Sequence, residues 1–330
     1  MKLVLIGFDF PDHQLGELRK EFAGTYEFRG FNPRHFDVRL ISTADVLVLV
    51  SSNGEVISKA SACRWVHSWS AGIDDYLLFE KFGGAGAPVL TNSAGSYGTQ
   101  ISEHVFALIF AFTRGIKTMI LNQERRKWEV PERLEGGAEL SEIRGKTIGV
   151  VGLGHVGLEV ARTAKALGLG VLGVRRDPSK DHRKPSLSSY VDEIFSTEDL
   201  APVLSRSDFV VNALPLTIKT KGLFNRSNFP RFKVGALFLS IGRGGTVVEV
   251  DLVDALREGK IAGAALDVFS KEPLPEDSPL WKMKNVIISP HCAGRSELHF
   301  AKAFGIFRDN LARYSKNEPL LNRIDVGIGY

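Results

Sequence analysis

The sequence predicts an α/β protein of two domains, each built on a parallel sheet with helices on both faces. The chain has 330 residues, of which 44% are hydrophobic. This length exceeds what one ordinary core encloses and suits two domains. Short apolar runs also alternate with helical patterns through most of the chain, which is typical of parallel strands joined by helices.

The charge balance excludes strongly basic classes of protein. Lys and Arg number 42 against 38 Asp and Glu, a formal net charge of +4, so neither nucleic acid nor an acidic membrane is indicated as a partner. The opening apolar run is too short for a secretory signal, and no later run approaches a membrane span. Cys63 and Cys292 lie far apart without a CxxC pattern, so we expect a cytoplasmic protein without a metal site.

The first part of the chain contains four strand candidates and one clear helix. The strands are expected at 2–7, 44–50, 63–69 and 88–92, with a helix at 13–22. No glycine-rich turn follows any of these strands. From 100 to 122 we expect one long apolar helix, of the kind that crosses between domains or packs in a subunit interface, with His104 as a packed or interface residue.

Six further strand candidates follow. They are "KTIGVVG", "LGVLGVR", "DFVVNAL", "ALFLSIG", "AGAALDV" and "NVIISPH", which begin at residues 146, 169, 208, 236, 262 and 285. Six strands with intervening helices make a complete doubly wound sheet. A last helix, expected at 299–316, returns the chain to the first domain.

A glycine-rich turn follows the first strand of this second series. Gly152, Gly154 and Gly157 have the spacing G-x-G-x-x-G between a strand and a helix. The first glycine permits a tight turn, the second lets a pyrophosphate approach the backbone, and the third lets the helix pack on the strand. The pattern predicts a dinucleotide site, the alternative being a tight turn that binds nothing.

Three charged residues each come just past a predicted strand of the second series. They are Arg243, Glu272 and His291. Taken singly, each could be a surface loop residue, a charge at a helix start or a polar strand end. Because ligands of open α/β sheets bind at the carboxyl ends of the strands, the three together predict a catalytic site beside the dinucleotide.

Ordered motifs identify a family resemblance over most of the chain. "WSAGIDD" at 69–75, "TNSAGSYGTQISEHVFAL" at 91–108 and "SPHCAG" at 289–294 resemble the D-isomer-specific 2-hydroxyacid dehydrogenases, in particular the glyoxylate/hydroxypyruvate reductases. The resemblance implies two Rossmann-like domains. A dinucleotide-binding domain at 99–291 would be inserted into a flavodoxin-like substrate domain at 1–98 and 292–330, with the active site in the cleft between them.

The resemblance also implies a role for each candidate catalytic residue. His291 would be the acid/base that protonates the C2 oxygen of a keto acid, and Glu272 would orient its imidazole. Arg243 would bind the substrate carboxylate with its planar, permanently charged guanidinium. The backbone amides of Ala71 and Gly72 would complete the carboxylate site.

The implied cofactor contacts surround the glycine-rich turn. His155 and Val156 would lie near the pyrophosphate, and Asp267 would meet the nicotinamide carboxamide. Further contacts are expected from Leu214, Pro215, Thr220, Ile241 and His291.

Arginine replaces the acid that usually binds the adenosine ribose. Counted from the glycine-rich turn, that position holds Arg175, followed by Arg176, and guanidinium groups suit a 2′-phosphate. NADP is therefore the expected cofactor and NAD remains possible, with Lys180 and Arg183 as additional phosphate ligands. The alternative is a solvated basic loop.

The expected activity is the reduction of a small 2-keto acid, such as glyoxylate or hydroxypyruvate, to the D-2-hydroxy acid. Two alternatives remain open. One is oxidation or reduction of another 2-hydroxy acid, either bulkier or a phosphoglycerate, and the other is a nucleotide-sensing protein that resembles the corepressors with this fold. The resemblance also implies a homodimer formed through the nucleotide-binding domain.

Overall fold

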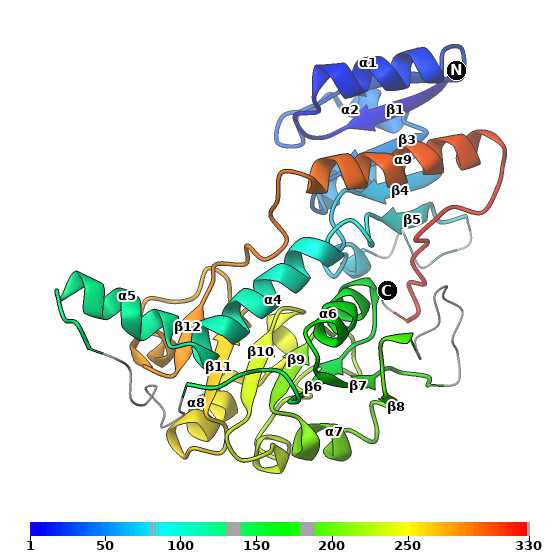
Figure 1. Cartoon of the computed structure of the whole chain (residues 1–330). Coiled ribbons are helices and arrows are strands. Elements are labelled where there is room, and N and C mark those ends of the chain that lie inside the picture. The colour runs from blue at the N-terminus through cyan, green and yellow to red at the C-terminus, as the bar shows by residue number, and fades with distance from the viewer. Residues whose placement is uncertain (80–81, 83, 85, 130–139, 179–188, 329–330) are drawn as a thin grey trace. The chain divides into compact units, whose positions relative to one another are not determined.

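The chain forms two compact units, each with one parallel sheet and helices packed on it (Figure 1). The computed structural model describes residues 1–79, 82, 84, 86–129, 140–178 and 189–328. The first unit comprises Met1–Ser96 and Glu297–Tyr330, and the second comprises Tyr97–Ser296. The second unit is thus one continuous stretch of chain, whereas the first is assembled from two.

The first unit contains a parallel sheet with the strand order β2-β1-β3-β4-β5. This is the flavodoxin-like order, which confirms the expected fold. The strands are β1 (Lys2–Ile6), β2 (Tyr26–Gly30), β3 (Val46–Leu49), β4 (Trp65–Ser68) and β5 (Val89–Asn92). The helices of this unit are α1 (Asp12–Glu21), α2 (Val38–Ser42), α3 (Gly54–Lys59) and α9 (His299–Ser315).

Alternating side chains of the first sheet pack into two separate cores. In β1, Val4 and Ile6 join a cluster that includes Phe307 of α9, whereas Leu5 joins a cluster that includes Val56 of α3. Both faces are therefore covered by helices, as continuous apolar strands require. β2, α2 and α3 were not predicted from the sequence.

The second unit contains a parallel sheet with the strand order β12-β11-β10-β9-β6-β7-β8. It has seven strands rather than the six expected, because the short β8 extends the edge beyond β7. The strands are β6 (Thr147–Val151), β7 (Gly170–Val174), β8 (Glu193–Phe195), β9 (Phe209–Asn212), β10 (Leu237–Ser240), β11 (Gly263–Leu266) and β12 (Val286–Ile288). The helices are α4 (Gly98–Thr113), α5 (Ile116–Glu124), α6 (His155–Ala166), α7 (Ala201–Arg206) and α8 (Glu249–Arg257).

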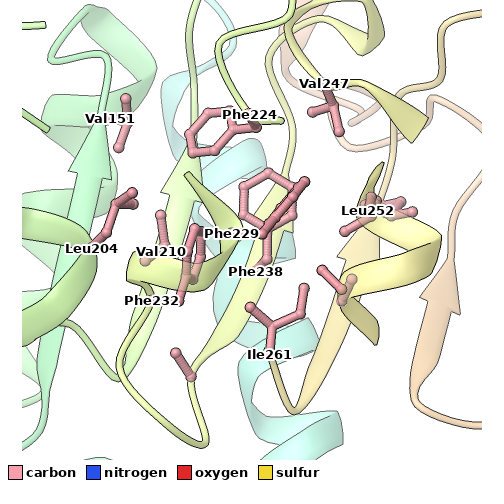
Figure 2. Close-up of a cluster of buried hydrophobic side chains, with 14 of the residues drawn as sticks. Val151, Leu204, Val210, Phe224, Phe229, Phe232, Phe238, Val247, Leu252 and Ile261 are labelled. Carbon is pink, nitrogen blue, oxygen red and sulfur yellow. The ribbon is translucent and has the colours of Figure 1, made fainter. Parts of the chain in front are cut away.

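The two faces of this sheet also carry separate cores. One core joins the sheet to α4 and α6, and the other joins it to α7 and α8. Figure 2 shows the second of these, where Phe224, Phe229, Phe232 and Phe238 pack together. Each phenyl side chain buried in this way stabilises the unit by roughly 1.5–3 kcal/mol, so the ends of β9 and β10 rest on a well-packed base.

The expected single helix over 100–122 is wrong, because the chain bends between α4 and α5. Gly115 has φ +65°, a left-handed conformation that ends helices and that glycine adopts without steric cost. The axes of α4 and α5 differ by 67°. In the described part of the chain no single helix has the length and apolarity to cross a membrane, although α4 and α5 counted together reach that threshold by length and composition.

Candidate active site

The three glycines of the turn between β6 and α6 differ in what a Cβ would meet at each position. Gly152 has φ +109°, and a Cβ there would lie 2.8 Å from the backbone of Ala213. A Cβ at Gly157 would overlap the carbonyl oxygen of Gly152, whereas one at Gly154 would meet no described atom within 4 Å. The turn is therefore closed on the protein side and open at Gly154.

The open side of this turn coincides with the start of α6. His155 and Val156 occupy the first turn of that helix, where the backbone N–H groups carry a positive partial charge. A pyrophosphate is the kind of group that such an opening accommodates. The residues present thus fit a dinucleotide, because no described atom lies within 4 Å of where a Cβ of Gly154 would be, so a ligand can approach there.

The segment after β9 forms the wall that faces this turn. Leu214 is 5% exposed, and its N–H donates to the Asn212 side-chain oxygen at 3.2 Å. The Thr220 hydroxyl donates to the Pro215 carbonyl at 2.6 Å and accepts from the Thr217 N–H at 2.8 Å. Thr220 therefore holds the turn that carries Pro215.

Arg175 and Arg176 follow directly after β7. The Arg175 backbone N–H donates to the Phe195 carbonyl of β8 at 3.0 Å, which fixes where its side chain begins. Its Nη1 atom is buried and has no hydrogen-bond partner within the described ranges. A buried guanidinium donor of this kind suits an anionic ligand. Lys180 and Arg183 lie outside the described residues.

The side chains of His291 and Glu272 lie in hydrogen-bond contact near the end of β12. Nδ1 of His291 lies 2.6 Å from Oε2 of Glu272, and the two side chains are 50% and 35% exposed. The other carboxylate oxygen of Glu272 accepts the Phe269 N–H at 2.9 Å. Glu272 is thereby fixed in place, and it orients the imidazole so that Nε2 is the nitrogen left for a ligand.

The backbone of His291 is itself unusual. His291 has φ +48°, a left-handed conformation that is uncommon for residues other than glycine, although histidine adopts it more often than most. Its N–H donates to the Asp267 carbonyl at 2.9 Å. A left-handed residue held by surrounding hydrogen bonds is typical of functional sites.

Arg243 lies in a tight turn after β10 that packs on two other loops. A Cβ at Gly242 would overlap the backbone of Leu214, and one at Gly244 would overlap the backbone of Phe269. Only glycines at these two positions let the turn approach both loops so closely. The structure therefore brings the Arg243 turn against both the Leu214 wall and the loop that leads to Glu272.

The buried side-chain amide of Asn212 connects these loops through hydrogen bonds. Asn212, which is fully buried, donates from Nδ2 to the Ser240 and Thr246 hydroxyls at 3.1 and 2.7 Å. The Thr246 hydroxyl in turn donates to the Arg243 carbonyl at 2.6 Å. Ile241 is 7% exposed and lies in the adjoining core.

Asp267 is not an open acid at the end of β11. It is 1% exposed, and it accepts hydrogen bonds from the Ser289 hydroxyl at 2.6 Å and from the N–H groups of Cys292 and Ala293 at 3.0 and 3.1 Å. Burial, followed by the nearby Asp267 carboxylate, raises the pKa of the Cys292 thiol. Cys292 therefore has the character of a packing residue rather than a nucleophile.

Ala71 and Gly72 lie after β4 in the first unit. The Asn92 side-chain N–H donates to the Ala71 carbonyl at 2.7 Å. Because the carbonyl and the next N–H of a trans peptide point in opposite directions, the N–H of Gly72 is directed away from Asn92. Both residues are partly exposed, so this peptide presents its donor side outward.

The polar side chains that hold these loops were not predicted from the sequence. Asn92, Asn212 and Ser289 each end a strand or follow one directly, and each is buried. A buried polar residue at the carboxyl end of an apolar strand is the signal that could have found them, because such a group must have hydrogen-bond partners.

The model of one protein family matches the second unit. The match covers residues 106–293 and has the description D-isomer specific 2-hydroxyacid dehydrogenase, NAD binding domain. It spans the glycine-rich turn, Arg243, Glu272 and His291.

Individual relatives cover more of the chain. A glyoxylate reductase of Korarchaeum cryptofilum is 30% identical over 96% of this chain and 93% of its own length. A D-3-phosphoglycerate dehydrogenase of Archaeoglobus fulgidus is 35% identical over 72% of this chain and 43% of its own length. The chain spans about half the length of the phosphoglycerate dehydrogenases that it matches.

A solved structure resembles the whole chain. The NADPH-dependent glyoxylate/hydroxypyruvate reductase of Sinorhizobium meliloti, in complex with NADP and sulfate, matches with a TM-score of 0.81 and 27% identity. The match covers 100% of both chains.

Proposed function

The chain belongs to the D-isomer-specific 2-hydroxyacid dehydrogenase family, and on that premise we propose that it reduces a small 2-keto acid to the D-2-hydroxy acid. The observation that carries the proposal is the His291–Glu272 pair, with 2.6 Å between Nδ1 and Oε2. An imidazole oriented by a carboxylate is a suitable general acid. The activity depends on hydride from a nicotinamide, which the bound cofactor supplies.

Each catalytic side chain has one role in this proposal. His291 gives a proton from Nε2 to the C2 oxygen of the keto acid, and Glu272 holds the ring in the orientation that this transfer needs. Arg243 binds the substrate carboxylate through its guanidinium fork. The N–H of Gly72, which points away from Asn92, and the N–H of Ala71 would be further donors for a substrate carboxylate.

The cofactor contacts are proposed from the same features. The turn at Gly152, Gly154 and Gly157 and the start of α6 at His155 and Val156 would bind the pyrophosphate. The nucleotide would be bordered by Leu214, Pro215, Thr220 and Ile241.

The nicotinamide end of the cofactor would lie near Asp267 and His291. Asp267 would act there largely through the turn that it supports, since its carboxylate is buried.

NADP is the proposed cofactor, with NAD as a weaker alternative. The buried donor on Arg175 would pair with a 2′-phosphate, and Arg176 would add a second positive charge. The similarity to a structure that is described as NADPH-dependent and contains NADP supports this preference.

Glyoxylate and hydroxypyruvate are the proposed substrates, because relatives that match over most of their own length are named as reductases of these acids. The direct test is a panel of 2-keto acids assayed with NADPH and with NADH. The proposal expects oxidation of NADPH with glyoxylate or hydroxypyruvate, and a D-configured product on chiral chromatography. Absence of turnover with every keto acid and both cofactors would refute it.

A homodimer formed through the second unit is also proposed. Apolar side chains on α4 and α5 are partly exposed: Phe110, Ile116, Met119 and Ile120 at 37–53%. Burial of such a surface against a second copy would stabilise a dimer. Light scattering at micromolar concentration should give twice the monomer mass of 36.3 kDa, and a monomer mass would exclude the dimer.

A cytoplasmic location is also proposed, because neither Cys63 nor Cys292 is in a disulfide bond, as is usual in a reducing compartment. Fractionation of cells that express the tagged chain would test this.

A further inference from the structure

A histidine on α4 contacts the strand end that leads to His291. Nε2 of His104 lies 3.0 Å from the Ser289 hydroxyl and 3.8 Å from Oδ1 of Asp267, and its side chain is 22% exposed. Its neighbours on the other helical faces belong to the core. His104 is thus the point at which α4 reaches the polar network around Asp267.

The hydrogen bonds of this network have a defined direction. The Ser289 hydroxyl donates its proton to Asp267 at 2.6 Å. A hydroxyl has one proton and otherwise accepts, so its oxygen must accept from His104. Nε2 of His104 therefore carries a hydrogen, and the chain of donors runs from His104 through Ser289 to Asp267.

Asp267 connects this network to the turn that carries His291 through hydrogen bonds. Its carboxylate accepts the N–H groups of Cys292 and Ala293, and its carbonyl accepts the N–H of His291. These bonds surround the residue with φ +48°. Because a left-handed conformation strains the backbone of a histidine, the turn depends on these hydrogen bonds.

We propose that His104 is a positioning residue of the dehydrogenase reaction, acting through Ser289 and Asp267 to hold the turn from which His291 donates its proton. The inference rests on the proposed function for its kinetic part. It differs from a packing role, because packing needs only the shape of the ring, whereas this role needs the Nε2 hydrogen.

The variants separate the hydrogen from the shape. His104→Gln keeps an N–H donor near the position of Nε2, and His104→Met fills similar space without a donor. His13→Met is the matched control, because His13 is exposed on α1 and lies outside the site. Ser289→Ala and the double variant His104→Met/Ser289→Ala complete a double-mutant cycle.

The kinetic expectation is a change in kcat without a change in KM. His104→Met should lower kcat for the keto acid about fivefold, because His291 spends less time in the reactive orientation. KM for the keto acid and for NADPH should stay within about twofold, since neither ligand is bound by His104. His104→Gln should restore most of kcat, and the double variant should lose no more than Ser289→Ala.

Two measurements on the unliganded full chain do not require activity. ¹⁵N NMR of the His104 ring should show a protonated Nε2, and hydrogen exchange of the Cys292 and Ala293 amides should quicken in His104→Met but not in His13→Met. If wild type reduces no keto acid, the proposed function fails while these two readouts still decide the inference. An unprotonated Nε2, unchanged exchange, unchanged kcat in His104→Met, or additive losses in the double variant would each overturn it.

Discussion

Two histidines near the carboxyl ends of parallel strands, one in each unit, have opposite surroundings. His67 lies within β4, is fully buried, and stacks on Phe307 with 5.2 Å between ring centroids. His291 lies beyond the end of β12 and its side chain is 50% exposed, with Glu272 beside it.

The protonation of His67 follows from its burial. Burial lowers the pKa of His67 to about 3, and hydroxyl oxygens of Thr91 and Ser93, rather than a carboxylate, lie beside its ring nitrogens. His67 therefore stays neutral and serves packing. The imidazole within a strand thus belongs to a core, whereas the imidazole beyond a strand end lies beside a carboxylate and is half exposed.

Removal of the exposed imidazole is expected to have the largest effect. His291→Asn should lower kcat by at least about a hundredfold, the usual contribution of a general acid, because asparagine has no titratable group. Asparagine tolerates a positive φ, so the turn should persist and the melting temperature and NADPH affinity should change little. Turnover close to that of wild type would show that the exposed imidazole of His291 is not the general acid.

The end of β10 provides the next test. Arg243→Lys keeps the charge but removes the planar fork, and a lost charged hydrogen bond costs about 1.5–3 kcal/mol. KM for the keto acid should rise by roughly 10- to 150-fold, as measured by steady-state kinetics. Arg226→Lys is the control, since Arg226 is 79% exposed and pairs with Asp251. Equal kinetics for the two variants would remove Arg243 from the substrate site.

Arg175, which follows β7, is expected to control the preference for NADPH over NADH. Arg175→Asp should move the ratio of kcat/KM from NADPH toward NADH by at least about tenfold, because a carboxylate repels the 2′-phosphate and can accept hydrogen bonds from the free ribose hydroxyls. Arg231→Asp, a charge reversal at an exposed arginine outside the proposed cofactor site, should leave the ratio unchanged. If wild type prefers NADH, or if the ratio does not move, the arginines are a basic loop and only the NADP proposal falls.

The buried histidine should affect stability rather than activity. The folded-state pKa of His67 is lowered from 6.5 to about 3, so below pH 6.5 the unfolded chain binds a proton that the folded chain excludes. This contribution to stability is complete above pH 6.5 and falls by about 1.4 kcal/mol per pH unit on acidification. Urea unfolding at pH 7 and pH 5 should show a smaller pH dependence for His67→Gln than for wild type.

The matched control for this measurement is His13→Gln, which removes an exposed histidine from α1. It should retain the pH dependence of wild type. If His67→Gln and His13→Gln respond alike to acid, the burial of His67 does not control acid stability.

Most of the fold could be predicted because central parallel strands are short apolar runs. The two strands that were missed are β2 and β8, which lie at sheet edges. Their burial patterns are mixed, so their sequences have no continuous apolar run. The break at Gly115 was also missed, because the apolar pattern continues on both sides and only the backbone conformation reveals the bend.

The candidate site could be predicted only in part. The glycine spacing and the order of Arg243, Glu272 and His291 are visible in the sequence, whereas the support from Asn212 and from His104 depends on hydrogen bonds across 28 and 185 residues. Asp267 illustrates the limit most clearly. Its sequence position places it at a strand end, but its partners Ser289, Cys292 and Ala293 follow from the turn geometry.

The division of the first unit into two segments has a consequence for synthesis on the ribosome. One face of its sheet, with Val4, Ile6 and Trp65, is completed by Phe304 and Phe307 of α9, which is made after the whole second unit. The second unit can therefore fold while this face still lacks its last helix. A nascent chain at that stage exposes one apolar face of the sheet, and chaperones are expected to bind such a surface.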